Sequence, residues 1–167
     1  MPSQSLGTLR YAPYPRDSQR LRLYRAQDTV PSGQALPELE ACQLYVDRVT
    51  SSEWWRLRYP HVTRVKVHWR LGRTAVASPM TNTISLPRSL RTERTNLHEL
   101  AHLVTPQGVA SHGPEYARTY LDIVAQFMGS DFAQELFQAF HTHRVRVAEP
   151  SSQEDRAGAT NSTRADI

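Results

Sequence analysis

The stretch Leu97-His98-Glu99-Leu100-Ala101-His102 lies in a segment, from about Arg91 to Val104, whose apolar residues recur at helical spacing. In an α-helix, residues i and i+4 lie one turn apart on the same face, so His98 and His102 can direct two imidazoles at one metal ion. Glu99 projects about 100° further round the helix, where its carboxylate can reach a water molecule beside that ion. This spacing predicts a catalytic metal site.

The opposite face of this helix is apolar. Four residues fall at i, i+3, i+4 and i+7, the spacing of a buried stripe: Leu97, Leu100, Ala101 and Val104. One face of the helix is therefore expected to anchor in the core, while the other presents the histidines to a cleft. A surface helix with two incidental histidines is the alternative, and it does not account for this separation of faces.

A catalytic zinc usually has three protein ligands and one open position, so a third ligand is required. His112 is the best candidate, because it lies where the chain turns into the next helix and Gly113 beside it permits a close approach. Glu115 and Asp122 are the alternatives, since a carboxylate can also bind zinc. The sequence therefore predicts that Zn²⁺ is held by His112 together with the two histidines of the helix.

Such a site would hydrolyse its substrate with a water activated by the metal. Glu99 is predicted to be the general base, which takes a proton from this water and returns it to the leaving amine. A further hydrogen-bond donor for the developing oxyanion is expected. Tyr116 is the candidate for this role, with Tyr120 and His68 as further possibilities. For each tyrosine, a core position on the helix stripe is the more common role.

The order of the elements predicts an α+β fold, because short strands cluster before three helices and do not alternate with them. Strands are expected at Leu21 to Arg25, at Thr63 to Arg70 with Val65, Val67 and Trp69 facing inward, at Thr74 to Ala77, and at Thr83 to Leu86. Helices are expected from Pro37, with Cys42 on the buried stripe, from Ser51 to Tyr59, from Arg91 to Val104, from Pro114 to Gly129, and after an N-cap at Ser130.

Composition divides the 167 residues into one domain and two tails. Residues 1–18 and 149–167 lack apolar periodicity and are expected to be disordered, which leaves a metallohydrolase domain over residues 19–148. The only cysteine, Cys42, excludes an intramolecular disulfide. No stretch has the length and hydropathy of a signal peptide or a membrane span, so a cytoplasmic protein without membrane contact is expected.

The run from Leu97 to His102, followed after nine residues by His112-Gly113 and a helix that contains Tyr116, resembles the SprT-like zincins. It is still more similar to a family of metallohydrolases from actinobacteria and their phages. The likeness is strongest from about Thr83 to Gly129. It implies a minimal zincin fold, with a small, mostly antiparallel twisted sheet packed against the active-site helix and further helices. It also implies that an extended peptide docks on an edge strand beside that helix, which by position would be Thr83 to Leu86.

The function predicted from these features is that of a zinc-dependent hydrolase, a metallopeptidase acting on a peptide or protein substrate. Hydrolysis of another amide, such as a cyclic amide, remains open because the motif leaves the pocket unspecified. A non-enzymatic module, in which zinc staples the fold and a basic face binds nucleic acid or protein, is the alternative. Net charge of +4 is only a weak signal for nucleic acid. Many SprT-like proteins also carry a cysteine-rich zinc ribbon that directs them to DNA, which a chain with one cysteine cannot form. The sequence does not indicate an oligomeric state.

Overall fold

A computed structural model describes residues 15–150 and shows an α+β fold, as the order of the elements predicts. Within these residues, every helix is too short or too polar to serve as a membrane span. The elements in chain order are α1 (Arg20–Gln27), α2 (Leu39–Ser51), α3 (Glu53–Arg58), β1 (Lys66–Trp69), β2 (Val76–Ser78), β3 (Thr83–Leu86), the 3-10 turn η1 (Arg88–Leu90), α4 (Glu93–Val104), α5 (Pro114–Met128) and α6 (Ser130–Thr142).

The sheet has three strands in the order β1-β3-β2. β3 pairs in parallel with β1, where Val67 lies opposite Ile84, and antiparallel with β2, where Ala77 lies opposite Ile84. The sheet is therefore mixed, and the expectation of a mostly antiparallel sheet is wrong. The expectation that Thr83–Leu86 forms the edge beside the metal helix is also wrong, because that strand is central. The edge strand that contacts α4 is β2.

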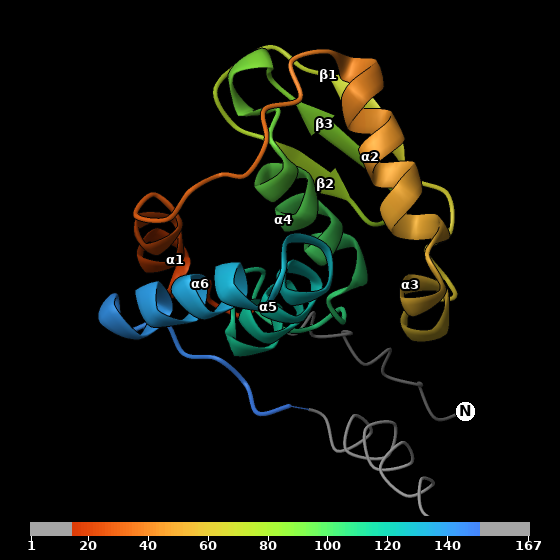
Figure 1. The fold of residues 1–167 in the computed structure, drawn as a ribbon. Helices are drawn as coiled ribbons and strands as arrows, with labels where there is room; N and C mark the ends of the chain where they lie inside the picture. The colour runs from red at the N-terminus through yellow and green to blue at the C-terminus, as the bar shows by residue number, and fades with distance from the viewer. Residues whose placement is uncertain (1–14, 151–167) are drawn as a thin grey trace, which may run out of the picture.

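The helix α4 lies between the sheet and the C-terminal helices (Figure 1). α2 packs along β1 and α4 packs along β2, and the two helices contact each other, so they cover one face of the sheet together. On its other side α4 contacts α5. In turn, α5 packs on α6, and α6 contacts α1. The buried stripe predicted for α4, from Leu97 to Val104, lies in the core as expected. This packing holds the histidine face of α4 towards α1 and the start of α5.

The first predicted strand, Leu21 to Arg25, is wrong, because these residues belong to α1. Leu23, Ala26 and Gln27 are buried, at the spacing i, i+3 and i+4 that marks one face of a helix, whereas Leu21 is 69% exposed. The alternation of five residues was too short to distinguish a strand from a helix. One face of α1 lines the site described below.

The remaining elements agree with the periodicity of the sequence, with two differences. Trp69 was expected to face inward with Val65 and Val67, which are buried, but it is 60% exposed as the last residue of the edge strand β1. Ser130 was expected to be the N-cap of the last helix, but it is the first helical residue. Gly129 precedes it with a φ of 101°, a left-handed conformation that a side chain disfavours.

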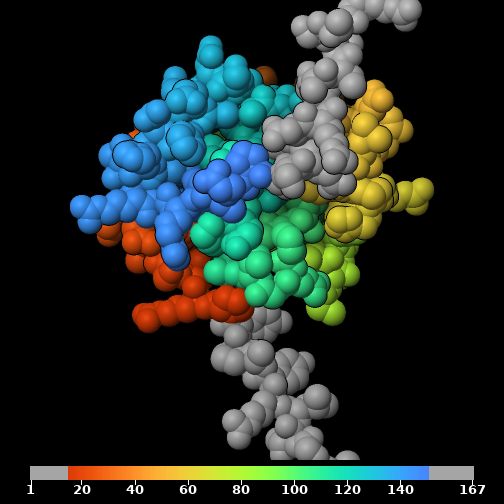
Figure 2. Space-filling view, turned by 90° about the horizontal axis from the view of Figure 1, so that it is seen from below, coloured from red at the N-terminus to blue at the C-terminus, as the bar shows by residue number. Residues whose placement is uncertain are grey.

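The ends of the described chain pack against each other. Gln19 donates from its side chain to the carbonyl of Arg146 at 2.9 Å and accepts from the Arg146 N–H at 3.0 Å. Ala148 N–H donates to the carbonyl of Pro114. Figure 2 shows the blue C-terminal segment next to the red N-terminal segment on this face. Residues 15–18 and 149–150 fall in the predicted tails; the rest of those tails, residues 1–14 and 151–167, lies outside the described residues.

Candidate metal centre

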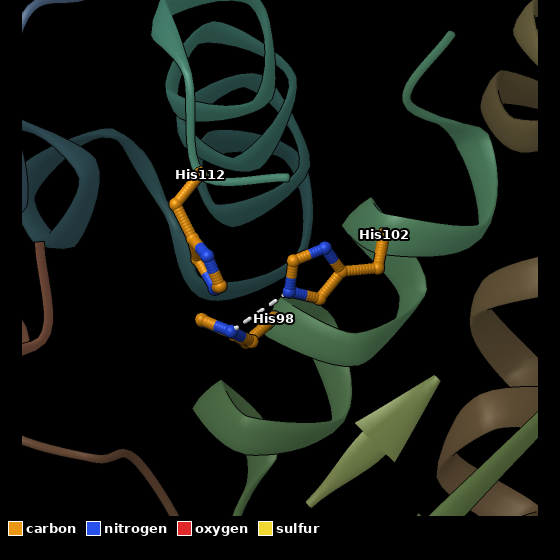
Figure 3. Close-up of side chains that lie close together, drawn as sticks. All are labelled: His98, His102 and His112. Atoms are coloured by element: carbon orange, nitrogen blue, oxygen red, sulfur yellow. Dashed lines mark hydrogen bonds between the residues drawn. The ribbon is translucent and has the colours of Figure 1, made fainter. Parts of the chain in front are cut away.

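Three imidazoles meet on one side of α4. His98 and His102 project from successive turns of that helix, and His112 comes from the turn just before α5 (Figure 3). One ring nitrogen of each lies within 4.8 Å of the others, and the Nε2 atoms of His98 and His102 are 3.2 Å apart. The predicted convergence of these residues is present in the structure, and the three histidines could hold a metal ion.

A buried glutamine fixes the orientation of the His98 ring. The Nδ1–H of His98 donates to Oε1 of Gln27, at the end of α1, with a separation of 2.8 Å. An amide oxygen can only accept, so in the neutral ring the proton is on Nδ1 and the lone pair is on Nε2. This leaves Nε2 of His98 free to bind a cation beside His102.

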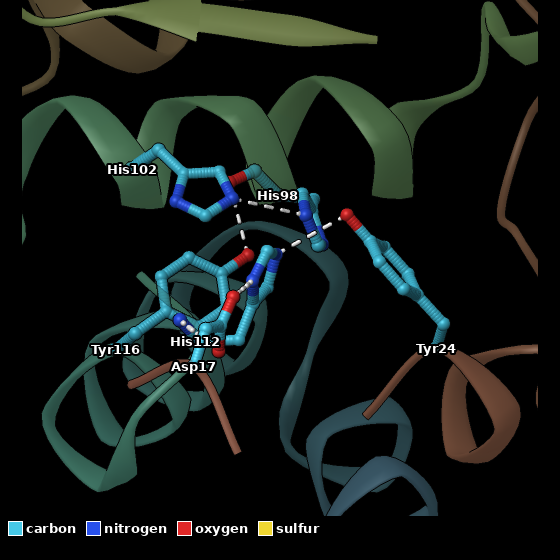
Figure 4. Close-up of polar contacts among 6 residues, drawn as sticks. All are labelled: Asp17, Tyr24, His98, His102, His112 and Tyr116. Carbon is cyan, nitrogen blue, oxygen red and sulfur yellow. Dashed lines mark hydrogen bonds and ion pairs between the residues drawn. The ribbon is translucent and has the colours of Figure 1, made fainter. Parts of the chain in front are cut away.

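A carboxylate holds His112 in the same way (Figure 4). Its Nδ1–H donates to Oδ2 of Asp17 at 2.8 Å, and its backbone N–H donates to Oδ1 of Asp17 at 3.2 Å. The remaining ring nitrogen, Nε2, accepts from the hydroxyl of Tyr24 at 3.2 Å. Carboxylate–histidine pairs of this kind set the tautomer of metal ligands and raise their basicity.

All three imidazoles are kept neutral by burial. Desolvation, assisted by the other histidines, lowers the pKa of His98 well below its usual value and lowers that of His102 to about 3. Burial also lowers the pKa of His112, although Asp17 partly offsets this shift. Neutral imidazole is the form that binds a metal, so the site is in its binding form at neutral pH.

Glu99 lies beside this cluster in a poorly hydrated position. Its side chain is 4% exposed, yet it lines both cavities at the site. Burial raises the pKa of Glu99 to about 8, and Arg70 opposes the shift. A carboxyl group with a pKa near neutrality is suited to accept and return a proton.

The two cavities form one cleft across the site. They have volumes of ≈490 and ≈830 Å³ and share five residues of their walls: Arg20, Tyr24, Ala75, Val76 and Glu99. Ala75 and Val76 lead into and begin the edge strand β2, so this strand forms one wall and α1 forms another. A ligand in the cleft would therefore pass between an open sheet edge and the metal cluster.

The other residues considered from the sequence have different positions. Tyr116 is fully buried; its ring stacks on His102 with a centroid distance of 4.3 Å, and its hydroxyl donates to the backbone carbonyl of His98 at 3.1 Å. Tyr120 is fully buried and lines the smaller cavity. His68 is exposed on β1 and lines neither cavity.

The rival third ligands, Glu115 and Asp122, are not part of the cluster of three histidines. Glu115 is exposed, and Asp122 accepts from Arg118 in the preceding turn of α5. Among residues 15–150, no cysteine or carboxylate joins the three histidines as a fourth member of the group. The predicted choice of His112 therefore agrees with the geometry.

Sequence analysis missed three residues of the site, namely Asp17, Tyr24 and Gln27. Tyr24 and Gln27 are three residues apart, so a helical interpretation of this segment would have placed them on one face. Asp17 had no such signal, because it precedes α1 and meets a residue 95 positions away.

None of the family models, curated proteins or solved structures compared with this chain matches it.

Proposed function

We propose that this protein is a zinc-dependent hydrolase, a metallopeptidase that cleaves peptide bonds in the cleft between α1 and β2. His98, His102 and His112 would hold the ion, and Glu99 would be the general base. The observation that carries the proposal is the meeting of three neutral imidazoles, two of them oriented by hydrogen bonds, beside a buried carboxylate that lines an open cleft.

The spacing of the two histidines on α4 supports zinc. Two nitrogens bound to one tetrahedral Zn²⁺ at about 2.0–2.1 Å would be about 3.3 Å apart. The Nε2 atoms of His98 and His102 are 3.2 Å apart. Other divalent ions accept the same nitrogen ligands, and zinc is chosen because it combines imidazole ligands with a coordination number of four. Bound there, the metal would act as a Lewis acid on the scissile carbonyl and on the attacking water.

The residues of the chain would do the rest of the chemistry. Glu99 takes a proton from the attacking water and passes it to the leaving amine. A nearby cation favours the charged, deprotonated form of a carboxyl group. A metal ion in the site would therefore lower the pKa of Glu99 from its value in the metal-free protein. Asp17 and Gln27 keep the rings of His112 and His98 in place during the reaction.

We assign to Tyr24 the oxyanion-stabilising role for which the sequence suggested Tyr116. The Tyr24 hydroxyl lies 3.2 Å from Nε2 of His112, and Tyr24 lines both cavities, so a substrate in the cleft can reach it. The Tyr116 hydroxyl already donates to the carbonyl of His98 and is fully buried. Tyr116 therefore supports the histidine side of α4, through its ring on His102 and its hydrogen bond to the His98 carbonyl.

A peptide suits the cleft because β2 is an edge strand. An extended chain can add to such an edge through backbone hydrogen bonds, which bind many different sequences. The alternative function, a structural zinc that staples a binding module, needs a closed site with four protein ligands. The described residues supply three, which supports the catalytic proposal.

The test is the substitution Glu99→Gln. It should leave one zinc per chain, measured by elemental analysis, and abolish cleavage of a quenched fluorescent peptide library. The matched control is Glu115→Gln, which changes an exposed glutamate in the next helix and should leave both zinc content and cleavage unchanged. Undiminished hydrolysis by the Glu99→Gln protein would reject the assignment, and loss of zinc from it would place Glu99 among the ligands.

A further inference from the structure

The smaller cavity of the cleft has a basic wall. Three arginines from separate parts of the chain line it: Arg20 on α1, Arg73 in the loop before β2, and Arg94 in the first turn of α4. Arg20 and Arg73 are exposed. Arg94 is fixed, because its Nη1 donates to the carbonyls of residues 27, 30 and 31. Asp28 and Glu99 are the carboxylates on this wall, so the guanidinium groups outnumber them.

Neutral donors line the same cavity. Tyr120 is fully buried there, and its hydroxyl has no hydrogen-bond partner among the described residues. The side chain of Gln27 also lines the cavity; its oxygen accepts from His98, which leaves the amide N–H groups as donors. A pocket walled by guanidinium, hydroxyl and amide donors matches a ligand that carries acceptors and negative charge.

The larger cavity has a different character. Its wall includes the apolar side chains of Pro79, Met80, Pro106 and Val109, and Met80 is 94% exposed. Among its lining residues Arg20 is the only arginine or lysine, and Arg20 is shared with the smaller cavity. The two halves of the cleft, which meet at Glu99, therefore differ in polarity.

We propose that the smaller cavity is a subsite for a carboxylate side chain, so that the preferred substrates are peptides with Asp or Glu on one side of the cleaved bond and an apolar residue on the other. Guanidinium groups pair with carboxylates through two parallel hydrogen bonds, which a neutral glutamine cannot reproduce in strength. The apolar half would bind a side chain such as Leu, because the apolar surface of that side chain would be removed from water. This inference rests on the proposed function for the position of the cleaved bond.

The experiment uses the full chain with Glu99→Gln, loaded with zinc, so that peptides bind without being cleaved. Fluorescent peptides carry Glu on one side of a central bond and Leu on the other, in both orders, and matched peptides carry Gln or Lys in place of Glu. In one of the two orders, fluorescence anisotropy should show binding of the Glu peptide about tenfold tighter than the Gln peptide, with the Lys peptide weaker still. The preference should shrink as salt is added.

Charge reversal locates the subsite. Adding Arg73→Glu should remove the preference for Glu over Gln and favour the Lys peptide. The control is Arg56→Glu, which makes the same change at an exposed arginine of α3 that lines neither cavity, and should keep the preference. Circular dichroism of both variants checks that the fold is retained.

The outcomes separate this inference from the proposed function. Equal binding of Glu, Gln and Lys peptides, absence of binding, or a preference untouched by Arg73→Glu would overturn the subsite. Cleavage by the wild-type chain is then measured on the same peptides. Cleavage without any effect of the acidic residue leaves the hydrolase and rejects the subsite. Selective binding of the Glu peptide with no cleavage leaves the subsite and rejects the hydrolase.

Discussion

The carboxylate of Asp17 accepts two hydrogen bonds from His112, one from the ring Nδ1–H at 2.8 Å and one from the backbone N–H at 3.2 Å. Both the ring and the backbone of His112, the proposed third metal ligand, are thus held by a residue that precedes the first helix. The site is completed by the N-terminal segment of the fold, and the metal motif of α4 alone does not define it.

Replacing Asp17 with alanine should weaken zinc binding by about 10- to 100-fold, the usual effect of removing a carboxylate behind a histidine ligand. The His112 ring would lose the acceptor that sets its tautomer. Competition with a chromophoric chelator measures the affinity. Asp131→Ala, at an exposed position in α6, is the control and should not alter it. An equal affinity for the Asp17→Ala protein would show that the pair does not support the metal.

Two matched hydroxyl deletions distinguish the tyrosines. Tyr24→Phe should lower kcat about 100-fold, as expected for the loss of an oxyanion donor, with little change in stability. Tyr116→Phe should instead lower the free energy of unfolding by about 1 kcal/mol, because the carbonyl of His98 loses its donor. Steady-state kinetics on a cleaved peptide and urea denaturation measure the two effects. The reverse result would return the catalytic role to Tyr116.

The core of the fold could be predicted from the sequence because its elements are long or strongly patterned. The stripe of α4 and the spacing of His98 and His102 follow from the helical period alone, which is a local property. The position of β3 in the sheet could not be predicted in this way. Three short strands allow several orders, and the order is decided by contacts between distant segments, such as the packing of α2 on β1 and of α4 on β2.

In the metal-free protein, Glu99 should make stability depend on pH. Burial raises its pKa from 4.5 to about 8, so the folded state keeps a proton that the unfolded state releases. This contribution is fully present below pH 4.5 and is lost as the pH rises to 8, by about 1.4 kcal/mol per pH unit. Glu99→Gln has no such group. The stability of wild type relative to this variant, from urea denaturation with a chelator, should therefore fall steadily with pH.

The histidines do not disturb this comparison. The lowered pKa of His102 changes stability in the opposite direction, because the stabilising contribution of this residue is lost as the pH falls below the pKa of the unfolded state. This contribution is the same in the wild type and in the Glu99→Gln protein. Adding zinc should flatten the difference, because a nearby cation favours the charged carboxylate. A difference that does not change with pH in the metal-free proteins would contradict the buried position of Glu99.

The apolar face of α4 should be separable from its histidine face. Leu100 is fully buried, and Leu100→Ala should lower the free energy of unfolding by about 2–5 kcal/mol through lost burial and a cavity. The folded fraction should still bind one zinc, since no ligand is altered. Denaturation in urea and zinc analysis of the folded protein check both points. Leu57→Ala, at a site exposed on α3, is the control and should have little effect on stability. A folded Leu100→Ala protein without zinc would show that the two faces are not independent.

The residues that orient the histidine rings could not be predicted from the sequence, for a physical reason. Gln27 and His98 are 71 positions apart in the sequence. A single glutamine forms no sequence pattern, and its role is evident only where the fold places its amide oxygen beside the ring nitrogen of His98. Histidines that lie on one face of a helix can be recognised from their spacing in the sequence. Side chains from distant segments that orient these histidines have no such spacing by which they could be recognised.

The guanidinium of Arg94 donates from one nitrogen to three carbonyls of residues 27–31, so the end of α1 is tied to the helix that carries two of the histidines. Gln27, which orients the His98 ring, is therefore held at a fixed place beside the helix that carries that ring, and an arriving ion would find this ligand already aligned. Little conformational entropy would then be lost on binding, and different divalent ions could be exchanged in the same scaffold without rearranging it.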